Sequence, residues 1–164
     1  DCVTPLLALD ARVEIADTAG STTVALADFI LGNRKTLLRP DQLLTAILIP
    51  KSVHPARSHF AKLGARKYLV VSIVIVAATL EVDASRVSAA RIALGAASAV
   101  GQRLPLLEAA LVGRPCDANL GQYARPEHLS PLAPIDDVRA SREYRLDAGF
   151  SLVRRVLSEL GARA

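Results

Sequence analysis

The sequence of 164 residues has no methionine, no tryptophan and only two cysteines. Three tyrosines and three phenylalanines are its only aromatic residues, so its core must consist of leucine, valine, isoleucine and alanine. Cys2 and Cys116 are too few for an iron–sulfur cluster held by four thiolates, and no CxxC pair suggests a zinc site. We therefore expect two free thiols in a reducing compartment and a cytoplasmic protein.

Long hydrophobic segments are also absent. The longest apolar run, residues 69–80, is interrupted by Ser72 and Thr79 and is shorter than the about 20 residues that a transmembrane helix needs. Its valines and isoleucines favour a buried β-strand instead. No signal peptide is visible. The sequence thus predicts no membrane span.

The net charge of +4 and the pI of about 9.4 leave two interpretations open, an anionic partner or a solvated arginine-rich surface. No basic run exceeds two residues and aromatic side chains for base stacking are few, so we expect no nucleic-acid partner. The three histidines, His54, His59 and His128, lack the spacing of metal ligands. We expect neither a metal site nor a catalytic residue in this chain.

The pattern of elements predicts an α+β fold in two units, residues 1–53 and 57–164, because strands precede helices instead of alternating with them. The polar stretch 51–58 with Pro55 indicates the boundary between the units. The first unit should contain a helix capped by Thr4, strands at 11–15, 22–24 and 46–49, and a helical turn at 40–42. The second should contain strands at 60–63, 71–82 and 87–94, helices at 104–112 and 141–160, and a loop with at most one helical turn at 116–135.

Two tracts carry most of the functional information. Residues 32–50 are GNRKTLLRPDQLLTAILIP, and residues 60–67 are FAKLGARK. Composition alone makes Lys62 a surface lysine and Leu44 a core leucine, and it gives the terminal residue Asp1 no role. A lysine at this position could also contact a phosphate or a flavin carbonyl.

These tracts resemble the FAD-binding (medium) subunit of the xanthine dehydrogenase and carbon monoxide dehydrogenase family of molybdenum hydroxylases. Residues 1–11, 91–96 and 137–145 continue the resemblance over nearly the whole chain, which corresponds to the C-terminal part of that subunit. The resemblance implies the end of an FAD-binding subdomain of the PCMH type. A CO dehydrogenase flavoprotein C-terminal-like domain, with an antiparallel three-stranded sheet and about three helices, should follow.

By this resemblance, five residues lie at the cofactor: Asp1, Leu44, Lys62, Tyr68 and Leu69. Leu43 is the neighbouring candidate if the register of the leucines is shifted by one. Arg34 and Lys35 are expected to be structural.

The resemblance further implies that FAD in this subunit passes electrons from iron–sulfur clusters to NAD or another acceptor. The molybdenum cofactor and the clusters are expected on partner domains or subunits. The two glycine-rich loops that hold the FAD pyrophosphate in the family are missing from this sequence, as is an initiating methionine. We therefore expect the back portion of a longer flavoprotein, which alone binds FAD weakly and is inactive. The alternative is a subunit-docking domain without flavin.

Overall fold

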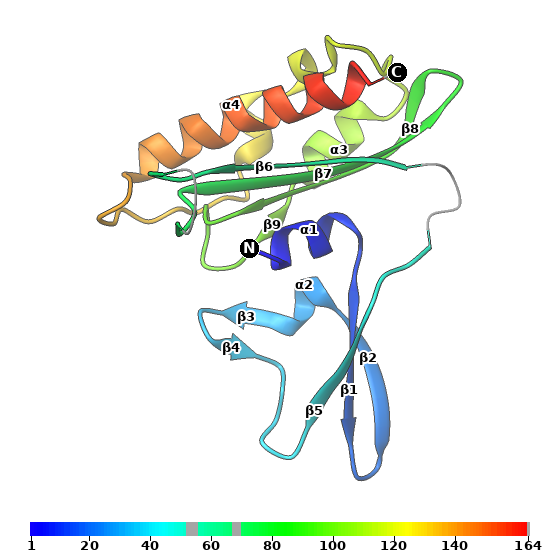
Figure 1. Ribbon diagram of the computed structural model, residues 1–164, viewed down its shortest axis with the longest axis vertical. Helices are drawn as coiled ribbons and strands as arrows, with labels where there is room; N and C mark the ends of the chain where they lie inside the picture. Colours follow the sequence, from blue (N-terminus) through cyan, green and yellow to red (C-terminus); the bar gives the residue numbers. More distant parts are fainter. Residues whose placement is uncertain (52–55, 67–69, 164) are drawn as a thin grey trace.

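The computed structural model describes residues 1–51, 56–66 and 70–163. Figure 1 shows two groups of elements, with the N-terminal helix between them. In the first group, strands β1 (Arg12–Asp17), β2 (Gly20–Ala25) and β5 (Leu43–Leu48) form an antiparallel sheet in the order β2-β1-β5. Helix α1 (Val3–Ala8), helix α2 (Leu26–Phe29) and the short strands β3 (Ile30–Gly32) and β4 (Lys35–Thr36) complete it.

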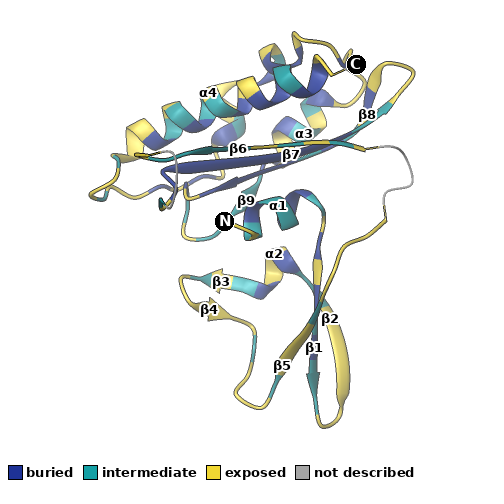
Figure 2. Cartoon of the chain, viewed as in Figure 1, coloured by how far each residue is buried: buried dark blue, intermediate teal, exposed yellow. Residues whose placement is uncertain are grey.

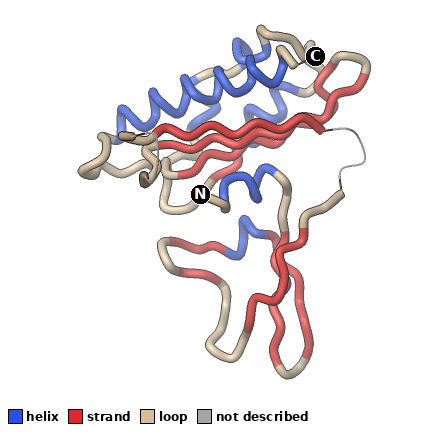
Figure 3. The backbone as a smooth tube through the Cα atoms, in the orientation of Figure 1, coloured by secondary structure: helices blue, strands red, loops and turns tan. Residues whose placement is uncertain are grey.

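The second group is built on an antiparallel four-stranded sheet in the order β6-β7-β8-β9. Its strands are β6 (Ala56–Leu63), β7 (Val74–Asp83), β8 (Arg86–Gly95) and the two-residue β9 (Gln102–Arg103). Helices α3 (Pro105–Leu111) and α4 (Arg142–Gly161) cover one face, and α1 lies on the other (Figures 1 and 3). The expected α+β class and the antiparallel sheet are confirmed, with β9 as an additional short strand.

Strand β7 is central because its sequence is apolar on both faces. Side chains alternate between the faces of a strand. Val74, Val76 and Leu80 therefore join the core beneath α3 and α4, whereas Ala77 joins the smaller core around α1. The turn after β7 uses two residues with positive φ, Ala84 (45°) and Ser85 (62°).

Helix α4 begins where the sequence predicts. The Ser141 hydroxyl accepts a hydrogen bond from the Tyr144 backbone N–H at 3.2 Å, which caps the first turn. Val153, Val156 and Leu157 recur at helical spacing and are fully buried against the sheet. The helix continues through Gly161, where a Cβ would overlap the backbone of Asp117, so only glycine permits this close approach.

Helix α1 belongs to the first group by sequence but packs on the second sheet. Leu7 and Ala8 are buried with Ala77 and Ala93, whose small side chains let the helix lie close to the strands. At Gly95 even a Cβ would overlap the Thr4 hydroxyl. The position of α1 is thus set by the sheet of the second group.

Strand β7 starts at Val74 instead of Val71, and β6 starts at Ala56, inside the expected boundary. The structure differs further from the local predictions in three places. Thr4 does not cap α1: the helix begins at Val3 after Cys2, and Thr4 is buried inside it. Residues 40–42 form a turn in place of a helical turn, and the strand that follows starts at Leu43. The expected loop 116–135 contains two 3-10 helices, Leu120–Tyr123 and Pro126–Leu129, whose leucines enter the main core.

The two groups bury their apolar residues to different degrees (Figure 2). Strand β7 of the sheet β6–β9 is buried (dark blue), whereas β5 is exposed along most of its length. Within the described residues, no helix has the length and apolar content that a membrane crossing requires.

Candidate functional site

Three polar side chains from distant parts of the sequence meet at one end of the second sheet. The Lys62 ammonium donates hydrogen bonds to the Asp1 carboxylate at 2.5 Å and to the Val70 carbonyl at 2.8 Å. The Ser72 hydroxyl donates to the other oxygen of Asp1 at 3.0 Å. We call Asp1, Lys62 and Ser72 the polar cluster.

Strand register explains why Lys62 reaches Asp1. Lys62 lies opposite Ile75, which in turn lies opposite Gly95, so all three occupy the same face of the sheet. Thr4 of α1 lies over Gly95 on that face, and Asp1 precedes α1. The start of the helix therefore lies over the end of β6.

Gly64 brings the Val70 carbonyl within reach of Lys62. A Cβ at Gly64 would lie 2.5 Å from Val70 Cγ1, so a larger residue would push the Val70 segment away. This geometry explains why a glycine follows the lysine by two positions in the tract 60–67.

A cavity of about 280 Å³ adjoins the polar cluster. Asp1 and Ser72 lie on its wall beside apolar side chains and the small residues at the ends of β8 and β9. Its wall consists of Asp1, Val3, Thr4, Ile30, Val71, Ser72, Ile75, Gly95, Ala96, Ala99, Val100, Gly101 and Arg139. A mainly apolar cavity with a few polar groups at one side suits a flat ring that has a polar edge.

The rim of this cavity is held by ion pairs. Asp137 pairs with Arg139 at 2.6 Å and with Arg145 at 2.7 Å. The backbone N–H of Arg139 and the Arg145 guanidinium hold the pKa of Asp137 at about 2, against the opposing effect of desolvation. Arg145 is buried and also donates to the carbonyls of Ile73 (2.6 Å) and Ala96 (2.9 Å), which fixes the ends of β7 and β8 to α4.

Two of the five predicted cofactor residues come together, Asp1 and Lys62. Leu44 does not join them: it lies on β5 opposite Ile15, in the sheet away from the polar cluster (Figure 1). Its exposed fraction of 41% also contradicts the interpretation as a core leucine on a helical turn. Leu43 is exposed to 72% on the same strand. Tyr68 and Leu69 lie outside the described residues.

Sequence reasoning missed Ser72 and Arg139. Ser72 is 3% exposed and is a polar residue within the apolar run 69–80, which is the signal that could have identified it. Arg139 carries no comparable signal, because its place at the cavity depends on how the loop before α4 folds. Among the described residues, no group of three potential metal ligands occurs, as far as His, Cys, Asp and Glu are concerned.

The chain has an antiparallel sheet with helices on one face and a lysine-centred polar cluster on the other. Comparison of the chain with family models then identifies the class of protein. Residues 59–160 match the CO dehydrogenase flavoprotein C-terminal domain. Residues 1–52 match the FAD binding domain in molybdopterin dehydrogenase. The chain therefore belongs to the family of FAD-binding subunits of molybdenum hydroxylases, as the resemblance implied.

Curated relatives agree with this assignment. The chain is 31% identical over 160 residues to the nicotine 6-hydroxylase medium subunit of Paenarthrobacter nicotinovorans, covering 96% of this chain and 55% of the relative. It is 30% identical over 166 residues to the xanthine dehydrogenase FAD-binding subunit of Escherichia coli O157:H7, covering 100% and 56%. The chain thus spans about half the length of these relatives.

Solved structures show the same fold. The reconstituted CO dehydrogenase from Oligotropha carboxidovorans matches with a TM-score of 0.90 at 27% identity, over 100% of this chain and 57% of that one. Quinoline 2-oxidoreductase from Pseudomonas putida 86 matches with a TM-score of 0.87 at 28% identity, over 98% and 55%.

Proposed function

We propose that this chain forms one side of an FAD site in a molybdenum hydroxylase-type oxidoreductase, where the flavin passes electrons from iron–sulfur clusters to NAD or another acceptor. The observation that carries the proposal is the polar cluster beside the 280 Å³ cavity. The family match of residues 1–52 to an FAD-binding domain supports it and favours it over a docking domain without flavin.

The residues present fit part of FAD. A hydroxyl and a carboxylate in the wall of a mainly apolar cavity, with the Lys62 ammonium bound to that carboxylate, complement the carbonyl and N–H groups along the edge of a flavin ring. The sequence offers no glycine-rich loop for the pyrophosphate. The chain would therefore contribute contacts to the ring side of the cofactor, and other residues must hold the phosphates.

Each member of the polar cluster has a distinct task in this proposal. Lys62 carries a positive charge that stabilises an electron-rich flavin, and its second hydrogen bond, to Val70, fixes its position. Asp1 is half-exposed and balances that charge. Ser72 is buried and holds the second oxygen of Asp1, so the carboxylate has one orientation.

Bound FAD supplies the redox chemistry, since it accepts and releases electrons. The chain's own residues bind and orient it and keep water from one side of the ring. Tyr68, Leu69 and Leu44 remain proposed contacts on the strength of the resemblance. Partner subunits or domains would carry the iron–sulfur clusters and the molybdenum cofactor.

A flavin titration tests the proposal. The front half of the E. coli xanthine dehydrogenase FAD-binding subunit would be fused ahead of Asp1, and bound FAD would be measured by absorbance after gel filtration. We expect the fusion to bind FAD and the chain alone to bind it weakly. Lys62→Met should weaken FAD binding by about tenfold, the factor for losing one charge-assisted hydrogen bond of roughly 1.5 kcal/mol.

Lys51→Met is the matched control, because Lys51 is exposed and lies outside the polar cluster. Equal FAD affinity in the Lys62 and Lys51 variants would refute the role of Lys62. A folded fusion that binds no flavin would contradict the proposed function itself.

A further inference from the structure

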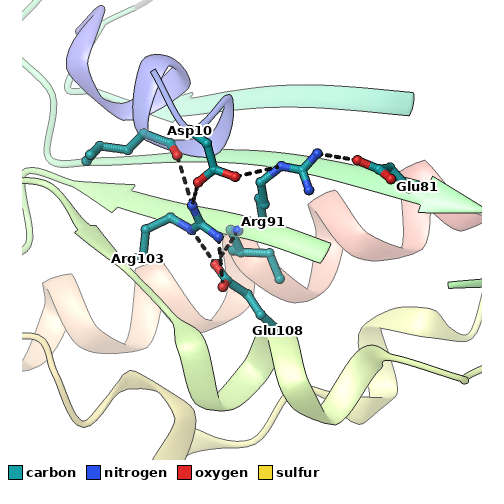
Figure 4. Close-up of polar contacts among 7 residues, drawn as sticks. Asp10, Glu81, Arg91, Arg103 and Glu108 are labelled. Carbon is teal, nitrogen blue, oxygen red and sulfur yellow. Dashed lines mark hydrogen bonds and ion pairs between the residues drawn. The ribbon is translucent and has the colours of Figure 1, made fainter. Parts of the chain in front are cut away.

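Figure 4 shows a network of five charged residues. It lies at the end of α1, whereas the polar cluster lies at the start of that helix. Asp10 follows α1, Glu81 is on β7, Arg91 is on β8, Arg103 is on β9 and Glu108 is on α3. We call these residues the charged network. It joins four elements of the second group to Asp10, which lies just after the end of α1.

Arg103 is the centre of the charged network. Its Nε–H donates a hydrogen bond to one oxygen of Glu108 at 2.5 Å, and its NH2 group donates one to the other oxygen at 2.9 Å. These two hydrogen bonds form a two-point contact with fixed geometry. Its NH1 group donates to Asp10 and, at 3.1 Å, to the Leu7 carbonyl in the last turn of α1. Arg103 thus binds both a backbone carbonyl of the helix and the residue after it.

Arg91 holds the second oxygen of Asp10 at 3.3 Å and also pairs with Glu81. Burial alone would lower the pKa of Arg103, but hydrogen bonds and charge from Glu108 and Asp10 outweigh it, so this pKa is above its usual value. Asp10 has φ of 51°, a left-handed conformation that aspartate adopts readily, and its backbone N–H donates to the Leu7 carbonyl at 3.1 Å.

Helix α1 is short, so its two ends move together. At 1.5 Å per residue a six-residue helix is about 9 Å long. Thr4 over Gly95 is a close contact near its start, and the charged network fixes its end. A shift at Asp10 would rotate the helix about the contact at Gly95 and move Asp1 relative to Lys62 and Ser72.

We propose that Arg103 and Asp10 are positioning residues for the cofactor site, which act through α1 to hold Asp1 against Lys62 and Ser72. This inference deepens the proposed function and rests on it for its relevance to flavin. Neither residue belongs to the polar cluster, and neither lines the cavity beside it.

The test uses the chain itself without flavin. The variant is Asp10→Asn, because asparagine tolerates the left-handed conformation; it removes the charge and one of the two acceptor oxygens that face Arg103 and Arg91. Reductive methylation followed by mass spectrometry reports the reactivity of each lysine, with exposed Lys35 and Lys51 as internal references. We expect labelling of Lys62 to rise by about fivefold, the factor for an ion pair of roughly 1 kcal/mol, while both references stay constant.

Two further variants make the result specific. Arg103→Lys keeps the charge and a donor for Asp10 but loses the two-point contact with Glu108, so labelling of Lys62 should rise less than in Asp10→Asn. Asp28→Asn removes the same charge from an exposed position on α2 and should leave Lys62 unchanged.

Unchanged labelling of Lys62 in both network variants would overturn the inference, and so would an equal rise at all three lysines, which indicates general loosening. These outcomes are separate from a failure of the proposed function. A fusion that binds no FAD while Lys62 responds to Asp10→Asn would refute the flavin site and leave the positioning role intact.

Discussion

The two sheets of this chain bury apolar side chains to very different degrees. On β7, Val74, Val76 and Leu80 are completely buried. Leu43 and Ile47 on β5 are exposed to 72 and 50%, and Ile49, just after the strand, is exposed to 52%. Both segments are mainly apolar, so hydrophobicity alone does not decide burial. What differs is the number of covered faces, because β7 has neighbours on both edges and helices on both faces.

Strand β5 lies at the edge of its sheet, and among the described residues no strand pairs with its outer side. An apolar edge with exposed side chains on both faces favours association with another surface. Helices of this chain thus cover both faces of the second sheet at β7, whereas the apolar surface of the first remains exposed.

The largest effect should come from the buried sheet. Leu80→Ala removes a fully buried side chain from the core beneath α3 and α4, and should lower the free energy of unfolding by about 2–5 kcal/mol. Leu43→Ala is the matched control, since it deletes the same atoms from an exposed site and should change stability by less than about 0.5 kcal/mol. Urea unfolding measures both. Equal losses would show that the contrast between the sheets is false.

A second test removes the buried cation between α4 and the sheet. Arg145→Leu leaves the carbonyls of Ile73 and Ala96 without their donor, at a cost of about 1–3 kcal/mol for each buried group left unsatisfied. Arg155→Leu on the exposed side of α4 should change the free energy of unfolding far less, because Arg155 is exposed and pairs with Glu159 at the surface. Comparable unfolding midpoints for the two variants would contradict this account.

Low pH should weaken the same junction between α4 and the sheet, where Asp137 pairs with Arg145. The pKa of Asp137 is lowered to about 2 from its usual 3.8, so the unfolded state takes up the proton first as the pH falls. The contribution of Asp137 to stability is therefore complete above pH 4 and disappears as the pH falls to about 2. Asp137→Asn should remove that part of the pH dependence. Thermal unfolding between pH 2 and 6 measures it, and identical acid profiles of wild type and variant would refute it.

The smallest effect on stability is expected on the open sheet. Ile47→Lys places a charge on the exposed edge strand and should reduce self-association with little change in unfolding. Sedimentation velocity at increasing concentration would report this. If the variant associates as strongly as wild type, the β5 surface is not the one that drives association.

The sequence predicted the fold well where periodicity was strong and poorly where contacts between distant segments decide. Helix α4, with its Ser141 cap and leucines at helical spacing, was predictable within a residue or two. The start of β5 at Leu43 was not: the strand was expected only at 46–49, because Pro40 and Asp41 favour a helix start locally, while pairing of β5 with β1 fixes the extended form.

The candidate site was predictable only in part. The tract around Lys62 indicated a contact with the cofactor by resemblance, and the structure brings Lys62 to Asp1. Ser72 and the charged network depend on strand register and on the path of α1, which local sequence does not encode. Leu44 is the reverse case. Its tract indicated a contact with the cofactor by resemblance, but the structure places Leu44 on β5, apart from Asp1 and Lys62.

The most direct test of the central claim is an NMR titration of the isotopically labelled chain with FAD, which detects weak binding residue by residue. The account predicts that signals of Lys62, Val70 and Ser72 shift with a common saturation curve, while signals of the buried strand β7 beyond Ala77 stay in place. Shifts confined to the exposed face of β5, or no shifts at the polar cluster at saturating FAD, would contradict it.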